Sequence, residues 1–547
     1  MEDLEKQFRD SCSKGNIEEV KTFLQSSEID LNCDDNNGKT GFFLACYKGR
    51  IGVVELLLAD KRIDINRAEN RGDVTPFFAV CALGRIEIMK LLLNDERVDI
   101  RKANRTGITP FFAACWKEHI EIVKLLLKDE RVDVNKVENN LRATPFWIAC
   151  QNKHIEMIKL LLDDERVDIN LANKDSETPF YIVCQDGEIE IVKLLLNFQR
   201  TKKNQVQRRI TRGKRKNKKF LLNDEGVELN KADQKGKSPF FIACYGGHIE
   251  TVKLLLNDPR VDINKARKNG ATPFYTACRH KNIEIVKLLL NNQRIDVNKT
   301  KKGNGTPLYI SCREAWMEET RGIEIVKLLL NEERVDVNKA NKEGKTPFHI
   351  ACEFIQSELV ELLLKDERID VNLVTKTGET AFHLACYEKQ SNVVKQLLND
   401  GRIDINQANN KGETPFHTTC LSECDDGLEL TQLLLNDKRV DINKADNDGA
   451  TPLWIASNGG VIKVVEFFFA SGREINLDAK DKKGRTALDI TRIPDKNFWE
   501  EEFFFEESFQ ERLKNCSKVT ELLIDPCETR VRLRKQFGFA GKKLSIF

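Results

Sequence analysis

The sequence predicts an all-α repeat solenoid, a stack of similar helical units, rather than one globular core. The first observation is a pattern of Thr-Pro, an aromatic residue and a closing Ala-Cys pair, which returns about every 34 residues, as at Thr109–Cys115 and Thr144–Cys150. The second is a strongly apolar octapeptide that follows most copies, as at Ile120–Leu127. A fixed period of this length indicates supersecondary units that bury their hydrophobic faces against their neighbours.

Each unit is expected to begin with a short helix, for which residues 110–116 are the example. Thr109 can accept a hydrogen bond from the free N–H groups of the first turn. Pro110 then occupies the first helical position, where its missing N–H costs nothing. The small residues Ala114 and Cys115 allow a neighbouring helix to approach closely. The spacing therefore predicts a Thr-capped helix that ends in a turn at 117–119.

The second helix of the example unit is expected over 120–127. Its only polar residues, Glu121 and Lys124, are three apart and can pair on one outward strip. A helix this apolar must be buried on two sides, against the first helix of its own unit and the second helix of the next. The chain then leaves in extended form over 129–135. A glycine two residues before the next Thr, such as Gly107 or Gly378, fits a turn that needs positive φ.

The repeat resembles the ankyrin repeat, whose pattern is Gly-x-Thr-Pro-Leu-His-x-Ala-Ala, then Gly-His-x-x-Val-Val-x-Leu-Leu-Leu, then Asp-Val-Asn. The resemblance covers roughly residues 1–492 and resumes at 516–524. It implies about 14 stacked repeats, each a helix-turn-helix with a β-hairpin loop. The family's His survives only as His349, His383 and His417, and its second Ala is usually Cys. Asp-Glu-Arg or a similar sequence replaces Gly-Ala before Asp-Val-Asn, and its Asp and Glu residues are expected to be solvated repeat positions rather than catalytic pairs.

Interruptions of the period divide the chain into six predicted segments. These are repeats 1–6 with an N-terminal cap over 1–197, a basic and unstructured insertion over 198–223, further repeats over 224–492, an acidic-aromatic insertion over 493–515, the second helix of the capping repeat over 516–524, and a basic tail over 525–547, which can form a short helix. The aromatic residues of 498–507 are expected to cover the open end of the stack, or to act as a peptide ligand. Two shorter insertions, after Cys312 and Cys420, lengthen the turn between helices, and Trp316 is a candidate contact residue in the first.

The insertion over 198–223 holds eleven Lys or Arg residues and no acidic residue. Without it, 77 basic residues remain against 86 acidic ones, so the repeats themselves are net acidic. A run within it resembles a classical nuclear localisation signal and can also contact a polyanion: Arg208, Arg209, Arg212, Lys214, Arg215, Lys216, Lys218 and Lys219. A solvated loop, or a segment absent from the mature transcript, explains the same run, because Leu-Leu-Asn stands at both of its ends.

Sixteen cysteines are present, and eleven occupy the same position in the first helix: Cys46, Cys81, Cys115, Cys150, Cys184, Cys244, Cys278, Cys312, Cys352, Cys386 and Cys420. Stacked helices lie about 8–10 Å apart, whereas a disulfide needs Cα atoms within about 7 Å. These thiols are expected to be buried and free, which indicates a reducing compartment. We therefore expect a cytoplasmic protein, with the nucleus as the alternative. We expect no signal peptide, because the first five residues are acidic and lack an apolar segment, and the apolar stretches of the sequence are too short to span a bilayer.

Motifs of catalysis and cofactor binding are absent from the sequence. There is no Gly-rich phosphate loop, no Gly-x-Ser-x-Gly, no His-Glu-x-x-His and no Cys-x-x-Cys. The seven histidines fall on repeat positions that are structural in ankyrin repeats. We predict no catalytic residue, no cofactor, no metal and no enzymatic activity.

In ankyrin repeats, partners usually meet the concave face, which is built from hairpin tips and the C-terminal end of the first helix. In this sequence that end is the residue after each of the recurring cysteines, and we expect binding through this face. We call this set the post-cysteine row: Tyr47, Ala82, Trp116, Gln151, Gln185, Tyr245, Arg279, Arg313, Glu353 and Tyr387. The candidate binding residues are Tyr47, Trp116, Gln151, Tyr245, Arg279, Arg313 and Tyr387, because Tyr, Trp and Arg are favoured at interface hot spots. Lysines near the loop tips make a partly acidic partner plausible: Lys102, Lys136, Lys231, Lys265, Lys299, Lys339 and Lys444.

The predicted function is a non-enzymatic scaffold or adaptor that binds other proteins. Nucleic acid is expected only through non-specific contact with 198–223. Two alternatives stay open. One is a nuclear regulatory cofactor that uses the basic insertion as its localisation signal, and the other is a substrate adaptor for a modifying enzyme.

Overall fold

The computed structural model describes residues 2–198, 226–315, 319–354, 356–422, 424–492 and 506–536. These residues form two compact units, Met1–Pro273 and Phe274–Phe547. Both units are built from paired helices, and the described residues contain no β-strand, only an isolated bridge between Asp34 and Thr40. The predicted all-α repeat architecture is therefore confirmed.

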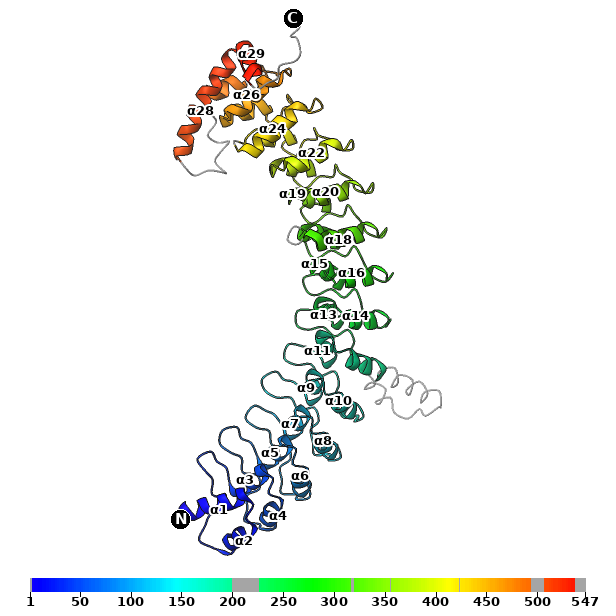
Figure 1. Ribbon diagram of the computed structural model, residues 1–547, viewed down its shortest axis with the longest axis vertical. Helices are drawn as coiled ribbons and strands as arrows, with labels where there is room; N and C mark the ends of the chain where they lie inside the picture. The colour runs from blue at the N-terminus through cyan, green and yellow to red at the C-terminus, as the bar shows by residue number, and fades with distance from the viewer. Residues whose placement is uncertain are drawn as a thin grey trace. The chain divides into compact units, whose positions relative to one another are not determined.

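In the N-terminal unit each repeat supplies a first and a second helix, joined by a tight turn (Figure 1). The helices are α1 (Glu2–Lys14), α2 (Ile17–Gln25), α3 (Gly41–Lys48), α4 (Ile51–Ala59), α5 (Pro76–Ala82), α6 (Ile86–Leu93), α7 (Pro110–Trp116), α8 (Ile120–Leu127), α9 (Pro145–Gln151), α10 (Ile155–Leu162), α11 (Pro179–Asp186), α13 (Pro239–Gly246) and α14 (Ile249–Leu256). Residues 189–198 are also helical.

The C-terminal unit continues the pattern and ends in a longer helical cap. Its helices are α15 (Pro273–Arg279), α16 (Ile283–Leu290), α17 (Pro307–Glu314), α18 (Glu319–Leu330), α19 (Pro347–Glu353), α20 (Ser357–Leu364), α21 (Ala381–Tyr387), α22 (Ser391–Asn399), α23 (Pro415–Thr419), α24 (Asp425–Asn436), α25 (Pro452–Gly459), α26 (Ile462–Ser471), α27 (Ala487–Arg492), α28 (Glu506–Ile524) and α29 (Pro526–Gln536).

The local chemistry of each repeat follows the sequence prediction closely. The Thr109 hydroxyl accepts a hydrogen bond from the Phe112 N–H at 3.1 Å, and Pro110 begins α7. Helix α8 buries Ile122, Val123 and Leu126 and packs against α7, α6 and α10. Because this packing repeats along each unit, every second helix is held on two sides, as its apolar composition requires.

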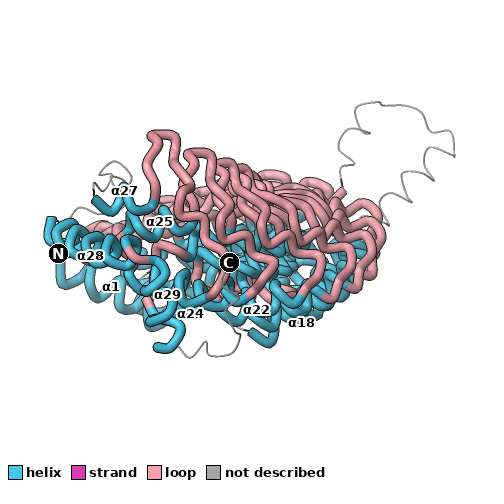
Figure 2. The backbone as a smooth tube through the Cα atoms, turned by 90° about the horizontal axis from the view of Figure 1, so that it is seen from above, coloured by secondary structure: helices cyan, strands magenta, loops and turns pink. Residues whose placement is uncertain are grey.

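Loops connect each second helix to the next repeat and gather on one side of the helices (Figure 2). Their tips form a ladder, in which the backbone N–H of one tip donates to the carbonyl of the preceding tip. Examples are Asn139 to Thr106 at 2.9 Å and Asn410 to Thr377 at 3.0 Å. Gly378 has a φ of 82° at such a tip, so the predicted left-handed turn is confirmed. Hydrogen bonds between tips add directly to the interfaces between repeats.

A second ladder consists of asparagine side chains, one from most repeats. In a typical rung, the Asn135 Nδ2 donates to the Arg166 carbonyl at 2.7 Å and its Oδ1 accepts from the Asp168 N–H at 2.8 Å. The same two-sided bridge is made by Asn32, Asn66, Asn170, Asn230, Asn298, Asn338, Asn372, Asn406 and Asn443. Each rung satisfies a backbone donor and a backbone acceptor of the next repeat.

The Asp-Glu-Arg segments, whose acidic residues were predicted to be solvated, also contribute an arginine to the interfaces between repeats. In one example, the Arg166 guanidinium pairs with Asp164 at 2.8 Å and also donates to the Leu127 carbonyl at the end of α8, at 2.6 Å. The last carbonyls of a helix lack partners within the helix and carry a partial negative charge, so an arginine is a suitable cap. Equivalent cross-repeat bonds are made by Arg62, Arg97, Arg334, Arg368, Arg402 and Arg439.

The C-terminal cap departs from the prediction in one respect. The second helix of the capping repeat was predicted over 516–524, but α28 begins ten residues earlier, at Glu506. The tail forms α29, which packs on α26 and buries Leu533. The domain boundaries given above remain predictions, and the acidic-aromatic residues 498–505 lie outside the described part. Within that part, no helix is long and apolar enough to cross a bilayer.

Candidate protein-binding surface

The backbone of the post-cysteine row is fixed by the repeat that follows it. The His119 Nε2 lies 3.1 Å from the Ala82 carbonyl, and the His248 Nε2 lies 2.6 Å from the Gln185 carbonyl. The Gln390 Nε2 donates to the Glu353 carbonyl at 2.9 Å. These contacts hold the C-terminal end of the first helix in place, while the row's side chains are directed outward.

Four aromatic side chains of the row are exposed. The exposed fraction is 39% for Tyr47, 41% for Trp116, 46% for Tyr245 and 62% for Tyr387. Aromatic residues on a well-packed base lose little conformational freedom on binding. The four residues predicted from the sequence as aromatic contacts are therefore accessible.

Lysines accompany three of these rings in the N-terminal unit. The Lys39 Nζ lies 5.5 Å from the Tyr47 ring centre, Lys117 lies 5.2 Å from Trp116, and Lys237 lies 5.3 Å from Tyr245. Lys39 and Lys237 directly precede the N-cap residue of the same repeat. The surface thus combines a loop cation with a helix aromatic, an arrangement stabilised by the ring quadrupole.

In the C-terminal unit the same positions are mainly charged. The Arg313 guanidinium pairs with Glu314 at 3.0 Å, and the Arg279 Nε lies 3.8 Å from the same carboxylate. Lys345 pairs with Glu353 at 2.8 Å, which repeats the loop-to-helix contact seen for Lys237 and Tyr245. Arg279 and Arg313 are half-buried, whereas Gln151 in the N-terminal unit is exposed. The predicted row is accessible along both units, although its arginines already have acidic neighbours.

Three of the seven lysines predicted to attract an acidic partner make structural contacts instead. The Nζ of Lys231, Lys265 and Lys444 donates to the carbonyl of the ladder asparagine in the preceding repeat, at 3.4, 2.7 and 3.0 Å. The lysines beside the aromatic rings are better placed to contact a partner.

Three histidines in the C-terminal unit are buried at the start of the first helix. The His349 Nδ1 accepts from the Thr346 N–H at 3.2 Å, and its Nε2 lies 3.2 Å from the Glu379 carbonyl of the next repeat. His383 repeats this arrangement. Burial lowers the pKa of His349 and of His417 to about 4, and also lowers the pKa of His383. The neutral imidazoles of His349 and His383 link neighbouring repeats.

The eleven cysteines that share one position in the first helices, here called the cysteine column, are buried and free, as predicted. Burial raises the pKa of each thiol in the column, as for Cys115 and Cys352, so these thiols are unreactive at neutral pH. Within the described ranges, no three His, Cys, Asp or Glu side chains lie together as metal ligands.

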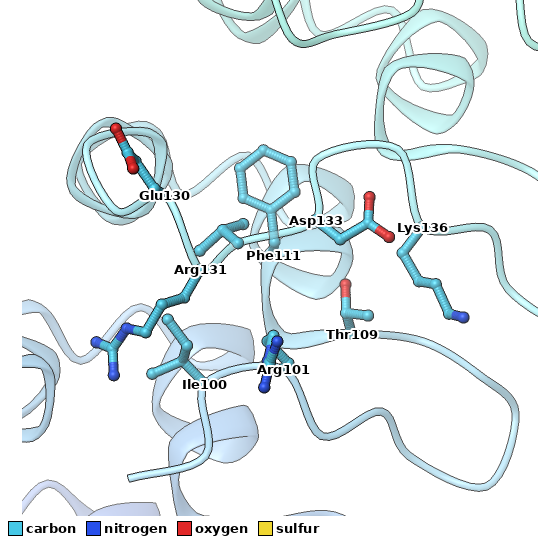
Figure 3. Close-up of a pocket in the computed structure, with 9 residues that line it drawn as sticks. Ile100, Arg101, Thr109, Phe111, Glu130, Arg131, Asp133 and Lys136 are labelled. Carbon is cyan, nitrogen blue, oxygen red and sulfur yellow. The ribbon is translucent and has the colours of Figure 1, made fainter. Parts of the chain in front are cut away.

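One site was missed from the sequence, although the signal was present. Arg101 stands where the other repeats carry the ladder asparagine, so one rung is lost. A cavity of about 390 Å³ lies there, lined by Ile100, Arg101, Thr109, Phe111, Glu130, Arg131, Val132, Asp133 and Lys136 (Figure 3). Comparing residues by repeat position would have singled out Arg101.

Several predicted residues lie outside the described part of the chain. They are Trp316 and the basic run from Arg208 to Lys219. Their proposed roles stay predictions.

The geometry of these repeats agrees with a comparison of the sequence with known families. The family model described as ankyrin repeats (3 copies) matches residues 10–69, 67–138, 130–207, 211–301, 294–375, 356–443 and 420–491. The chain belongs to the ankyrin repeat family. No curated protein matches it. Ankyrin repeats generally mediate contacts between proteins, and their family is usually non-catalytic.

Proposed function

We propose that this chain is a non-enzymatic scaffold or adaptor that binds other proteins through its post-cysteine row. The observation that carries the proposal is the row's combination of a backbone held by the next repeat, as at Ala82 and Gln185, with exposed aromatic side chains, as at Trp116 and Tyr245. A surface of this kind presents anchors for an interface without having to reorganise.

The partner is proposed to present acidic groups beside an apolar surface. Lys39, Lys117 and Lys237 each lie over an exposed ring, so an acidic group could pair with the lysine while an apolar group covers the aromatic face. Such a pairing favours rapid association more than high affinity, and it weakens as salt increases.

The test is a triple variant of the N-terminal unit, Tyr47→Ala, Trp116→Ala and Tyr245→Ala, used to capture a partner identified with the wild-type chain. Loss of a single anchoring aromatic weakens an interface by about 2 kcal/mol or more, so we expect Kd to rise by at least roughly thirtyfold. The helical circular dichroism should stay unchanged, because these side chains are exposed.

The matched control replaces outward residues of second helices in the same unit: Glu87→Ala, Glu121→Ala and Glu250→Ala. In the part of the chain that the structure describes, each glutamate pairs only with a lysine three residues later on an exposed strip. Binding should be unaffected in this control. Equal binding by both variants would show that the partner contacts another surface.

The proposed compartment is the reducing cytoplasm, supported by the column of buried free thiols. A nuclear role is the alternative, and it rests on the basic run from Arg208 to Lys219. If the run directs import, a wild-type fluorescent fusion should be nuclear, and deletion of residues 199–222 should move it to the cytoplasm. If the chain is a cytoplasmic scaffold, both fusions should be cytoplasmic.

A further inference from the structure

The cavity beside Arg101 lies where the asparagine ladder is interrupted. In an intact rung, one carboxamide bonds a carbonyl and the N–H two residues later, as Asn66 does with Arg97 and Asp99, both at 2.7 Å. The corresponding groups here are the Arg131 carbonyl and the Asp133 N–H. Among the described residues, neither group takes part in a hydrogen bond. The repeat therefore keeps both halves of the rung but lacks the side chain that joins them.

A second link is missing at the same interface. Arg97 and Arg166 each donate to the end of the second helix in the preceding repeat. Within the described residues, Arg131 bonds only to Asp129, and its guanidinium points away from the Asp133 side of the cavity (Figure 3). The space between these two loop segments is consequently open, and Arg101, Arg131, Asp133 and Lys136 are all exposed.

We propose that this vacant rung, the Arg131 carbonyl with the Asp133 N–H, binds the primary carboxamide of an Asn or Gln side chain on a protein partner. In the intact rungs, an asparagine carboxamide reaches the equivalent carbonyl and N–H at 2.6–3.0 Å. The proposal rests on the proposed function as a protein-binding chain, and it adds a contact site distinct from the post-cysteine row.

Chemistry selects a carboxamide over its nearest competitors. A carboxylate is acceptor-only, so it could take the Asp133 N–H but would face the Arg131 carbonyl without a donor. A trans peptide unit directs its N–H and C=O to opposite sides, so a single unit cannot reach both atoms. A primary carboxamide offers a donor and an acceptor on one edge.

The charges around the cavity are also mixed rather than uniformly basic. Arg101, Arg131 and Lys136 are balanced in part by Glu130 and Asp133. Such a lining favours a neutral polar group over a free anion. The Arg101 and Lys136 side chains are long enough to contact neighbouring residues of the ligand while the two backbone atoms hold its amide.

The test is selection of binders from a random peptide library against the full chain, followed by assays on two variants. Arg101→Asn supplies the missing carboxamide from within the chain and should exclude the ligand. Arg101→Ala leaves the rung vacant and removes the cation. Selected peptides should share an Asn or Gln, lose at least about tenfold in affinity on Arg101→Asn, and stay within about threefold on Arg101→Ala.

Three results would overturn the proposal: equal binding to wild type and Arg101→Asn, loss of binding on Arg101→Ala, or a shared Asp or Glu in place of the amide. Hydrogen exchange checks the vacancy without a ligand, because the Asp133 amide should exchange more slowly in Arg101→Asn than in wild type or Arg101→Ala. Variants of the post-cysteine row should not affect these peptides. If the post-cysteine row proves not to bind a partner, the difference in peptide affinity between Arg101→Asn and Arg101→Ala can still be measured.

Discussion

The third residue of each first helix is filled differently in the two units. The N-terminal unit uses aromatic residues there, such as Phe112 and Trp147. Three repeats of the C-terminal unit have histidine instead, at His349, His383 and His417, while others keep an aromatic residue, as at Tyr309. Trp147 donates its Nε1–H to the Glu177 carbonyl at 3.0 Å, much as His349 and His383 reach the next repeat. The comparison shows that one cross-repeat bond can be made with or without a titratable group.

The largest expected difference between the units is their response to acid. The pKa of each of the three histidines is lower in the folded state than the ordinary 6.5, so the unfolded state binds more protons below that pH. Their contribution to stability is complete above pH 6.5 and is lost as the pH falls toward about 4. One pKa unit corresponds to about 1.4 kcal/mol, so the C-terminal unit should lose several kcal/mol.

Hydrogen exchange at pH 7 and pH 4.5, corrected for intrinsic rates, measures the acid sensitivity of each unit separately. Helices α19, α21 and α23 should lose far more protection than α7, α9 and α11. The control carries His349→Phe, His383→Phe and His417→Phe, which copies the N-terminal unit at this position. Equal acid sensitivity in wild type and this variant would show that the histidines are not responsible.

The arginine links offer a second contrast, of intermediate size. Arg334 in the C-terminal unit donates to the Leu290 carbonyl at 2.6 Å, whereas Arg131 in the N-terminal unit makes no cross-repeat bond within the described residues. Hydrogen bonds from charged groups contribute about 1.5–3 kcal/mol when buried, and Arg334 is partly exposed. Arg334→Gln should lower the local opening free energy of α16 and α18 by about 1–2 kcal/mol. Arg131→Gln should change the local opening free energy of α6 and α8 little. Effects of the same size in the two variants would show that the cross-repeat bond of Arg334 does not stabilise its interface.

One loop-tip position differs between a repeat of the N-terminal unit and a repeat of the C-terminal unit, with an expected effect of about 1 kcal/mol. The N-terminal unit places Arg142 at a φ of 57°, where the C-terminal unit has Gly378 at 82°. Arg142→Gly should raise the unfolding midpoint because it relieves left-handed strain. Gly378→Ala should lower the midpoint, since its Cβ would lie 2.5 Å from the Asn410 nitrogen. A lower midpoint for Arg142→Gly would show that the glycine's entropy outweighs the strain.

The smallest predicted difference concerns thiol reactivity and leaves stability unchanged. All cysteines of the N-terminal unit are buried, but Cys424 and Cys527 in the C-terminal unit are exposed. Hydrogen bonds from Ser422 and from the Gly427 backbone, with Lys389 nearby, lower the pKa of the Cys424 thiol. Iodoacetamide at pH 7 should therefore modify Cys424 first, as followed by mass spectrometry, and Ser422→Ala should slow the reaction. Faster modification of a column cysteine would contradict the assigned burial.

Much of this fold could be predicted because its signals are local and repeated. Thr109, Pro110 and Gly107 each encode a cap or a turn by their own chemistry, and the apolar pattern of 120–127 fixes two buried sides. The cross-repeat roles of Arg166 and Asn135 depend on atoms more than 30 residues away, so they needed the structure. In the sequence, the only sign of this site is that Arg101 replaces the asparagine found at this position in the other repeats. Its cavity depends on the space between two neighbouring loops.

The central claim is that partners bind the post-cysteine row. Hydrogen exchange of the full chain, with and without a captured partner, tests it directly. We predict protection concentrated at the ends of α3, α7 and α13 and in the loops that carry Lys39 and Lys237, with α4, α8 and α14 unchanged. Protection confined to the second helices would contradict the account.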